Sequence, residues 1–343
     1  MSKFTDAAAT MYGLSVAGME EASRLGLRGT DVDHLFLALV TSEQAAGQVL
    51  RGAGITLAAA REAVAAQHAE QLRALGVDHE PPAPGPIVFH ETGGYEWTDR
   101  AQEVFKRSGS KGNDGGSIAV LRALLDEPSG LIEAVLGRLG VSGGELLARA
   151  DAVERIPSFG GVSRPSRAPL SRSTTAFVPA PVGDVWELLA DPRRMPEWDM
   201  VLGVVDVPDG AGEGPPRVGA VWGVSLATHA PDGKPFKQRP GMQRASIELL
   251  ASDELELISW RVRYPGNPRA NSRRTTITLA PAAGGAQLGI SFEWEPVAGR
   301  RAPSLVKRAQ RLLLRPAMRF AVWMQTAQIG SGISRVFRST PGG

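Results

Sequence analysis

The chain has 343 residues, which is long enough for about two domains, each with its own hydrophobic core. Hydrophobic residues make up 43% of it and charged residues 22%, a balance typical of soluble globular proteins and not of disordered or membrane chains. There is no cysteine, which excludes disulfides, thiolate nucleophiles and cysteine metal sites together.

The chain also lacks an uncharged apolar stretch of about 18 residues, the length that a membrane span requires. It begins MSKFTDAAAT, which does not have the pattern of a signal peptide, so we expect a cytoplasmic protein. Residues 1–155 contain 14 Lys/Arg against 21 Asp/Glu, whereas residues 156–343 contain 24 against 15. These opposite net charges favour two separate domains.

The first part of the chain, residues 4–75, is rich in alanine and predicts four helices. The first helix is expected to be capped by Thr5 or Asp6, and the second to begin near Asp31. The third is expected to include Ala45–Leu50, and the fourth to begin at Thr56. Three of its segments return later in the chain. The pairs are Phe4–Ala8 with Trp97–Ala101, Val32–Leu39 with Ser117–Leu124, and Val49–Ile55 with Val135–Val141. Residues 1–156 are therefore predicted to form an all-α double four-helix repeat.

This repeat resembles the Clp N-terminal domain over about residues 3–155. The resemblance implies a module that binds peptides, adaptors or cyclic peptides, with the aromatic residues Phe4 and Trp97 at that surface. It also implies that Asp33, beside His34, helps to bind arginine-phosphorylated proteins. The second repeat has Ile118 and Ala119 at the equivalent place, so one of two acidic sites is missing. Phe4 as a core residue and His34 as a helix-start side chain remain the alternative interpretation.

Clp unfoldases need a phosphate-binding GxxxxGK[ST] loop, and the sequence has none. We therefore expect no ATP hydrolysis and interpret the module as detached from its motor. Residues 157–169 are rich in Gly, Pro, Ser and Arg without hydrophobic periodicity, which predicts a linker to a second domain at residues 170–338.

The second domain is predicted to open with a strand at 174–178 and a helix that starts near Pro181. A second short helix carries Trp198. Six further strands are predicted at about 200–208, 217–226, 243–250, 255–263, 272–280 and 286–294, before one long helix at about 303–337.

This order and the stretch PAPVGDVWELLADPRRMPEWD resemble the START-like (SRPBCC, polyketide cyclase/dehydratase) superfamily over about residues 170–338. The resemblance implies an α+β helix-grip fold, in which a curved antiparallel sheet wraps around a long C-terminal helix and leaves an apolar cavity. We expect large apolar walls from five tryptophans, which are alternatively core residues: Trp198, Trp222, Trp260, Trp294 and Trp323.

The predicted long helix carries a basic stripe, which indicates either a solvated outer face or contact with an anionic membrane surface. Its members are Lys307, Arg311, Arg315 and Arg319. No nucleic-acid recognition motif accompanies them, so we expect no nucleic-acid partner. Pro316 predicts a kink in this helix.

Catalytic signals are sparse. The five histidines have no metal-ligand spacing, so no metal and no cofactor are expected. If the second domain is an enzyme, His229, Arg261 or Tyr264 would move a proton on a polyketide.

The sequence favours a non-enzymatic protein that joins a peptide-binding module to a domain holding a hydrophobic small molecule. Such a protein would be an adaptor or decoy for Clp protease components, or would sequester a cyclic-peptide antibiotic. The alternative is a polyketide cyclase or dehydratase with an accessory Clp-like module.

Overall fold

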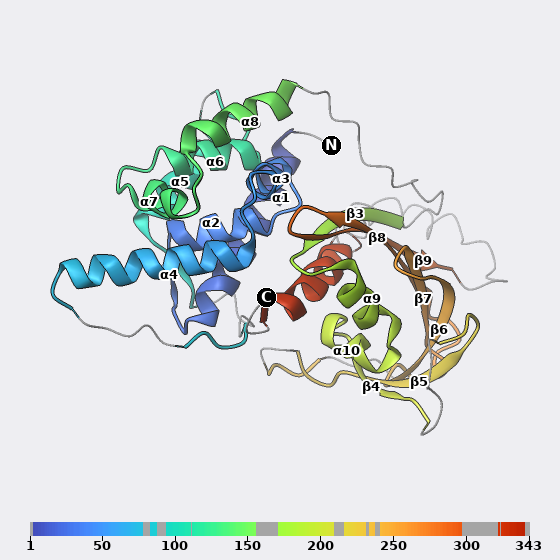
Figure 1. The fold of residues 1–343 in the computed structure, drawn as a ribbon. Coiled ribbons are helices and arrows are strands. Elements are labelled where there is room, and N and C mark those ends of the chain that lie inside the picture. Colours follow the sequence, from blue (N-terminus) through green and yellow to red (C-terminus); the bar gives the residue numbers. More distant parts are fainter. Residues whose placement is uncertain are drawn as a thin grey trace, which may run out of the picture. The chain divides into compact units, whose positions relative to one another are not determined.

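The computed structural model describes residues 3–77, 83–87, 94–110, 112–155, 171–208, 216–230, 233–236, 241–296, 322 and 324–339, with side chains from residue 7 onward. The chain divides into two compact units (Figure 1). One unit is Met1–Gly160 with Phe337–Gly343, and the other is Gly161–Val336. The predicted linker at 157–169 lies outside the described residues.

The described part of the first unit contains eight helices in two successive sets of four. The first set is α1 (Lys3–Arg24), α2 (Val32–Val40), α3 (Ala45–Gly52) and α4 (Leu57–Ala74). The second set is α5 (Asp99–Ser108), α6 (Ser117–Leu125), α7 (Leu131–Arg138) and α8 (Gly143–Arg155). This is the order that the predicted repeat requires.

Several helices of the first unit begin where the sequence predicts. Asp31 and Thr56 are the N-caps of α2 and α4, and their side chains accept backbone hydrogen bonds there. The predicted caps Thr5 and Asp6 were wrong, because α1 begins at Lys3 and includes both residues.

Short strands connect the two sets of helices. β1 (Gly29–Thr30) pairs in parallel with β2 (Glu96–Trp97). Directly after them, the hydroxyl of Thr98 donates to the carboxylate of Asp31 at 2.5 Å. The N-cap residues of α2 and α5 therefore bond to each other, which fixes the start of one set against the start of the other.

The core of the first unit forms around α2 and α6, whose described side chains are mostly buried. Leu35, Phe36, Leu121 and Leu124 have no exposed surface. Because these two helices are apolar on nearly all sides, their sequences show little 3.6-residue periodicity.

The second unit is built on a sheet of seven antiparallel strands in the order β3-β9-β8-β7-β6-β5-β4 (Figure 1). The strands are β3 (Ser171–Val178), β4 (Leu202–Asp206), β5 (Val221–Leu226), β6 (Arg244–Asp253), β7 (Leu257–Arg263), β8 (Ser272–Ala282) and β9 (Gly285–Glu295). All seven predicted strands are confirmed.

The predicted start of β5 was wrong. Residues 217–220 form a turn in which the amide of Ala220 donates to the carbonyl of Arg217. Gly219 has φ +89°, a left-handed conformation that only glycine adopts readily, so the strand cannot extend through it. Val218, which lies in this turn, is consequently exposed.

Helices pack on one face of this sheet, which curves around them (Figure 1). They are α9 (Val182–Ala190), a 3₁₀ turn (Pro192–Arg194), α10 (Met195–Trp198) and a C-terminal helix described at residue 322 and over 324–339. The indole N–H of Trp260 on β7 donates to the carbonyl of Leu189 at 3.2 Å and so fixes α9 to the sheet.

Glycines let the C-terminal helix approach closely. A Cβ at Gly330 would lie 2.9 Å from that of Ala176 on β3, and one at Gly332 would overlap the carbonyl oxygen of Trp198. The first part of the predicted helix, with Lys307, Arg311, Arg315, Arg319 and Pro316, lies outside the described residues. Among the helices that are described, none is both long and apolar enough to span a membrane.

Candidate functional site

One row of paired residues crosses five strands on the helix-covered face of the sheet. It runs through Trp222, Ile247, Val262, Arg273 and Trp294. Four members are apolar or aromatic, and the fifth is an arginine whose side chain is only 4% exposed. Arginine is almost never fully buried unless it is paired, so this position requires an explanation.

The partner of Arg273 is Asp199, which directly follows α10 and is 6% exposed. The guanidinium Nη2 donates to Asp199 Oδ2, and the other carboxylate oxygen accepts the amide of Val201 at 3.3 Å. Burial alone would lower the pKa of Arg273, but the charge and hydrogen bond of Asp199, together with Tyr264, outweigh burial and raise that pKa. Arg273 therefore stays charged beside the carboxylate of Asp199.

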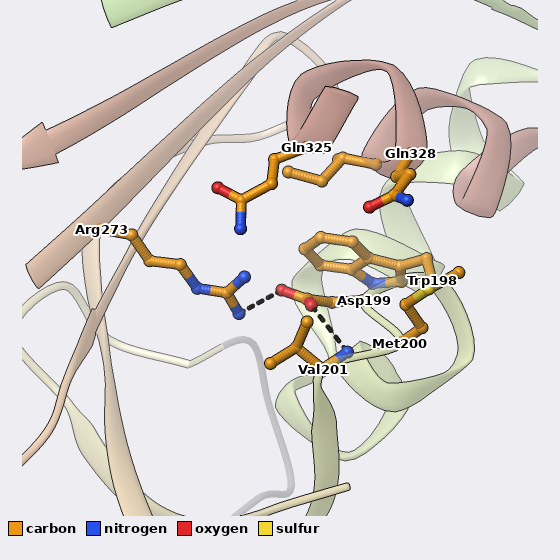
Figure 2. Close-up of a pocket in the computed structure, with 8 residues that line it drawn as sticks. Trp198, Asp199, Met200, Val201, Arg273, Gln325 and Gln328 are labelled. Carbon is orange, nitrogen blue, oxygen red and sulfur yellow. Dashed lines mark hydrogen bonds and ion pairs between the residues drawn. The ribbon is translucent and has the colours of Figure 1, made fainter. Parts of the chain in front are cut away.

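A small, partly open cavity of about 20 Å³ adjoins this ion pair (Figure 2). It is lined by Trp198, Asp199, Met200, Val201, Arg273, Gln325, Gln328 and Ile329, which come from α10 and the segment after it, from β8 and from the C-terminal helix. Figure 2 shows the side chains of Gln325 and Arg273 pointing toward one another, with Trp198 and Val201 beside the carboxylate. The volume suffices for one water-sized group.

Three buried polar atoms around the cavity have no hydrogen-bond partner within the described part of the chain. They are Nε1 of Trp198, Nε of Arg273 and Oε1 of Gln325. Two are donors and one is an acceptor. Buried polar atoms are nearly always hydrogen-bonded in native proteins, so these three atoms are exceptions.

The predicted tryptophans occupy different environments. Trp198 lines the cavity, whereas Trp222 and Trp260 pack against each other with ring centroids 5.9 Å apart. Trp294 is half-buried and meets Phe292 edge-on at 5.6 Å. Trp323 lies outside the described residues. Of the four tryptophans in this predicted set that the structure describes, Trp198 is the one that lines the cavity.

The residues considered for catalysis are not brought together. His229 is exposed in a loop, where its Nδ1 lies 3.0 Å from the hydroxyl of Thr228. Arg261 projects from the outer face of the sheet and is bound by Glu295 at 2.7 Å. Tyr264 is buried and, by strand alternation, follows Val262 on the opposite face from Arg261.

In the first unit, the proposed acidic residue Asp33 is buried and already engaged. Its oxygens lie 2.8 Å from Nδ1 of His34 and 3.4 Å from Nε2 of His68. The amide of Asp31 also lies 3.2 Å from Nδ1 of His34. One nitrogen cannot both accept and donate, and the shorter contact to a carboxylate favours a protonated Nδ1. Burial alone would raise the pKa of Asp33, but the hydrogen bonds and charge of His34, together with the charge of His68, outweigh burial and lower that pKa.

The aromatic residue predicted to bind partners in the second repeat, Trp97, is half-buried. Its ring meets Phe105 edge-on at 5.0 Å. It also lies over Gly18, where a Cβ would come within 2.7 Å of the indole. The side chain of Phe4 lies outside the described residues.

Asp199, Arg273 and Gln325 were not among the candidates selected from the sequence. One signal for Arg273 was present. In β8 the residues Arg273, Thr275, Ile277 and Leu279 alternate with outward-facing ones, so the arginine stands at an inward position. Asp199 and Gln325 carry no comparable local signal, because their role depends on a contact with distant strands.

Comparison with known proteins concerns the second unit. Residues 170–320 match the family described as "Polyketide cyclase / dehydrase and lipid transport". This confirms the predicted START-like resemblance for that region. The match does not reach the first unit, and the predicted resemblance to Clp N-terminal domains has no support from it. No curated protein matches the chain.

Solved structures of similar chains include proteins from three bacteria. One from Chromobacterium violaceum is 22% identical, covering 48% of this chain and 98% of its own, with a TM-score of 0.31. One from Mesorhizobium loti is 17% identical, covering 50% and 98%, with a TM-score of 0.31. A polyketide-cyclase-like protein from Corynebacterium glutamicum is 20% identical, covering 49% and 91%, with a TM-score of 0.33.

Proposed function

Because residues 170–320 are a domain of the polyketide cyclase and lipid transport type, we propose that the second unit binds a hydrophobic small molecule without transforming it. The observation that carries this proposal is the cavity beside Arg273 and Trp198, whose lining combines apolar side chains with the ion pair of Arg273 and Asp199. Ligand sites typically combine such apolar walls with a few placed polar groups.

The charges at the cavity favour binding over catalysis. A general acid or base must gain and lose a proton near the working pH. The pKa of Arg273 is raised, so its guanidinium stays protonated and cannot act as a general base, and Asp199 is bound to it in an ion pair. Their arrangement is suited to orienting a ligand.

A cyclase or dehydratase remains the second candidate, because the family description names that activity and because the buried Tyr264 lies close enough to influence the charge of Arg273. Turnover of an aromatic polyketide that is lost in Tyr264→Phe or His229→Ala would favour this alternative. Stoichiometric binding without turnover would favour a binder.

For the first unit we retain the proposal of a peptide- or partner-binding module of the Clp N-terminal kind. The half-buried Trp97 supports it, since aromatic residues that are anchored on one side are common binding hot spots. Asp33 supports phosphoarginine binding less well, because His34 and His68 occupy its oxygens. The whole protein would then act as an adaptor, a decoy for a Clp protease or a sequestering protein for a cyclic-peptide antibiotic.

A cavity-filling variant tests the binding proposal. Val201 lines the cavity, and Val201→Phe should fill it and lower the affinity of the full chain for 2-naphthol by about tenfold or more, as measured by calorimetry. Val204 is 72% exposed on β4, so Val204→Phe adds the same side chain without touching the cavity and should leave the affinity unchanged. Equal affinities of both variants and the natural chain would place the ligand elsewhere.

A further inference from the structure

A buried arginine in the first unit is held by two neighbouring carboxylates of α1. The guanidinium of Arg338 donates to the carboxylate of Glu20, and its Nη1 donates to Oε1 of Glu21 at 3.3 Å. Phe337–Gly343 belong to the first unit, so this contact lies within it. The three side chains are at most 3% exposed. Two carboxylates therefore enclose one guanidinium out of reach of solvent.

The same site also holds the main chain of the arginine. Nη2 of Arg61, on α4, donates to the backbone carbonyl oxygen of Arg338 at 3.0 Å. Arg61 is itself fixed, because its Nε and Nη2 bond to the two oxygens of Glu21, each at 3.0 Å. The first unit thus contacts both the side chain and the carbonyl group of one residue, which are the features of an arginine within a peptide chain.

The two carboxylates favour a guanidinium over other side chains. Burial alone would lower the pKa of Arg338, but the charges and hydrogen bonds of Glu20 and Glu21 outweigh burial and raise that pKa. A neutral side chain of the same shape would leave carboxylate charge buried without its counterion, which is strongly unfavourable. A lysine ammonium is a point charge and lacks the planar fork that reaches two carboxylates at once.

Arg338 itself is not a perfect occupant. Within the described residues, two carboxylates face three guanidinium groups, because Nη1 of Arg24 also lies 3.6 Å from Glu21. Burial and the charges of Arg61 and Arg338 lower the pKa of Arg24. In addition, Nε of Arg338 has no hydrogen-bond partner in the part of the chain that the structure describes. An arginine of another chain could make the same contacts, so exchange of one arginine for the other costs little beyond the loss of the covalent tether.

We infer that the first unit contains a receptor site for an arginine residue, which Arg338 fills from the same chain and which an arginine-bearing segment of a partner protein would occupy in its place. A tethered group competes at an effective concentration on the order of millimolar. The natural chain should therefore bind arginine peptides weakly, and removal of Arg338 should uncover the site. The site uses carboxylates other than Asp33, and it does not depend on the ligands proposed above for either unit.

The test uses Arg338→Ala in the full chain and three capped amino acids, each titrated calorimetrically at pH 7. N-acetyl-arginine N-methylamide supplies the guanidinium and the carbonyl group. The corresponding citrulline compound replaces the guanidinium by a neutral urea of nearly the same shape, and the lysine compound supplies an ammonium. We expect the arginine compound to bind the variant at least about tenfold more tightly than it binds the natural chain, and at least about tenfold more tightly than the other two compounds bind the variant. Equal affinities of the three compounds for the variant, or no binding by any of them, would overturn the inference and leave the proposed functions standing.

Two further variants locate the binding. Arg149 pairs with Glu145 on the surface of α8, where both side chains are about half exposed, so Arg149→Ala is the matched control and should bind the arginine compound no better than the natural chain does. Glu20→Gln, added to Arg338→Ala, should weaken binding of the arginine compound severalfold.

A purely structural role of Arg338 predicts a different result. In that case Arg338→Ala would unfold the first unit, and no ligand would restore it. If the site accepts an arginine from outside, the arginine compound should raise the unfolding temperature of Arg338→Ala, measured by circular dichroism at the helix band, while the citrulline compound should not. A variant that stays unfolded in the presence of the arginine compound would contradict the inference.

Discussion

At the scale of single residues, the second unit depends on one buried ion pair. Arg273 stands in an apolar row of the sheet, and Asp199 comes from the end of α10, 74 residues earlier in the chain. Removing one member of a buried pair leaves the other charge without compensation, whereas replacing both by apolar side chains costs much less. The ion pairs of Arg261 on the outer face are less buried, since its partners Glu248 and Glu295 are about one-fifth exposed.

We therefore predict that Arg273→Met lowers the free energy of unfolding by roughly 3–5 kcal/mol, because Asp199 would remain buried and charged. The double variant Asp199→Leu/Arg273→Met should recover most of that loss. Arg261→Met should cost about 1 kcal/mol or less, since water screens its ion pairs. Urea unfolding followed by tryptophan fluorescence measures the free energy of unfolding of the second unit, because six of the seven tryptophans lie after residue 170. Equal losses for the two arginine variants would contradict the distinction.

At the scale of elements, α3 is placed by a close contact with the end of α2. Nη1 of Arg51 donates to the carbonyl oxygens of Val40 and Ser42 at 2.6 and 2.7 Å, where the last carbonyls of α2 need partners. Burial lowers the pKa of Arg51 to about 10, so the side chain remains charged at neutral pH. The approach is possible because Gly47 has no side chain. A Cβ there would overlap the carbonyl oxygen of Ser42 and lie 2.7 Å from that of Leu39.

Two glycines of α3 provide a matched pair of substitutions. Gly47→Ala should destabilise the first unit by about 1–3 kcal/mol or more, since backbone atoms have to move. Gly52 lies in the same helix with no atom within 4 Å of an added Cβ, so Gly52→Ala should stabilise it by roughly 0.5–1 kcal/mol through helix propensity. Thermal unfolding followed by circular dichroism at the helix band distinguishes the two. A stabilising Gly47→Ala would show that the contact between α2 and α3 is looser than the structure has it.

At the scale of the whole molecule, the two units have different candidate functions and opposite net charges along the sequence. The first unit also includes residues from the other end of the chain. The guanidinium of Arg338 is buried and bonds to the carboxylates of Glu20 and Glu21 within that unit. A fragment that ends at residue 160 would lack this arginine, so fragments are a poor substitute for the full chain in functional tests.

We predict that peptide binding by the first unit is separable from ligand binding by the second. In the full chain, Trp97→Ala should weaken binding of a fluorescein-labelled cyclic peptide rich in Phe, Leu and Val by at least about tenfold, because an aromatic anchor is lost. Asp33→Asn should change it little, and free phosphoarginine should not bind, since histidines already engage that carboxylate. Fluorescence anisotropy measures both.

The exposed Leu75 supplies the control for this experiment, because Leu75→Ala alters the same unit away from Trp97. Binding of 2-naphthol should be the same in all three variants. A cyclic peptide that binds Trp97→Ala as well as the natural chain, or loses its affinity in Asp33→Asn, would contradict the prediction.

Local patterns in the sequence determined a large part of the fold. Alternating residues such as Leu288, Ile290 and Phe292 identified β9, because side chains alternate faces with a period of two. The caps Asp31 and Thr56 located two helix starts, because capping depends on residues within one turn. Errors occurred where a single residue overrode the pattern, as Gly219 did at the start of β5.

The candidate site depended on the tertiary structure. Arg273 and Asp199 meet only because the register of seven strands and the position of α10 bring residues 74 apart into contact. Gln325 joins them from a helix near the end of the chain. Periodicity and capping report interactions within a few residues, whereas an ion pair inside an apolar face depends on register, burial and the absence of water. For this reason the sequence indicated a domain with a cavity, and only the structure showed which residues line it.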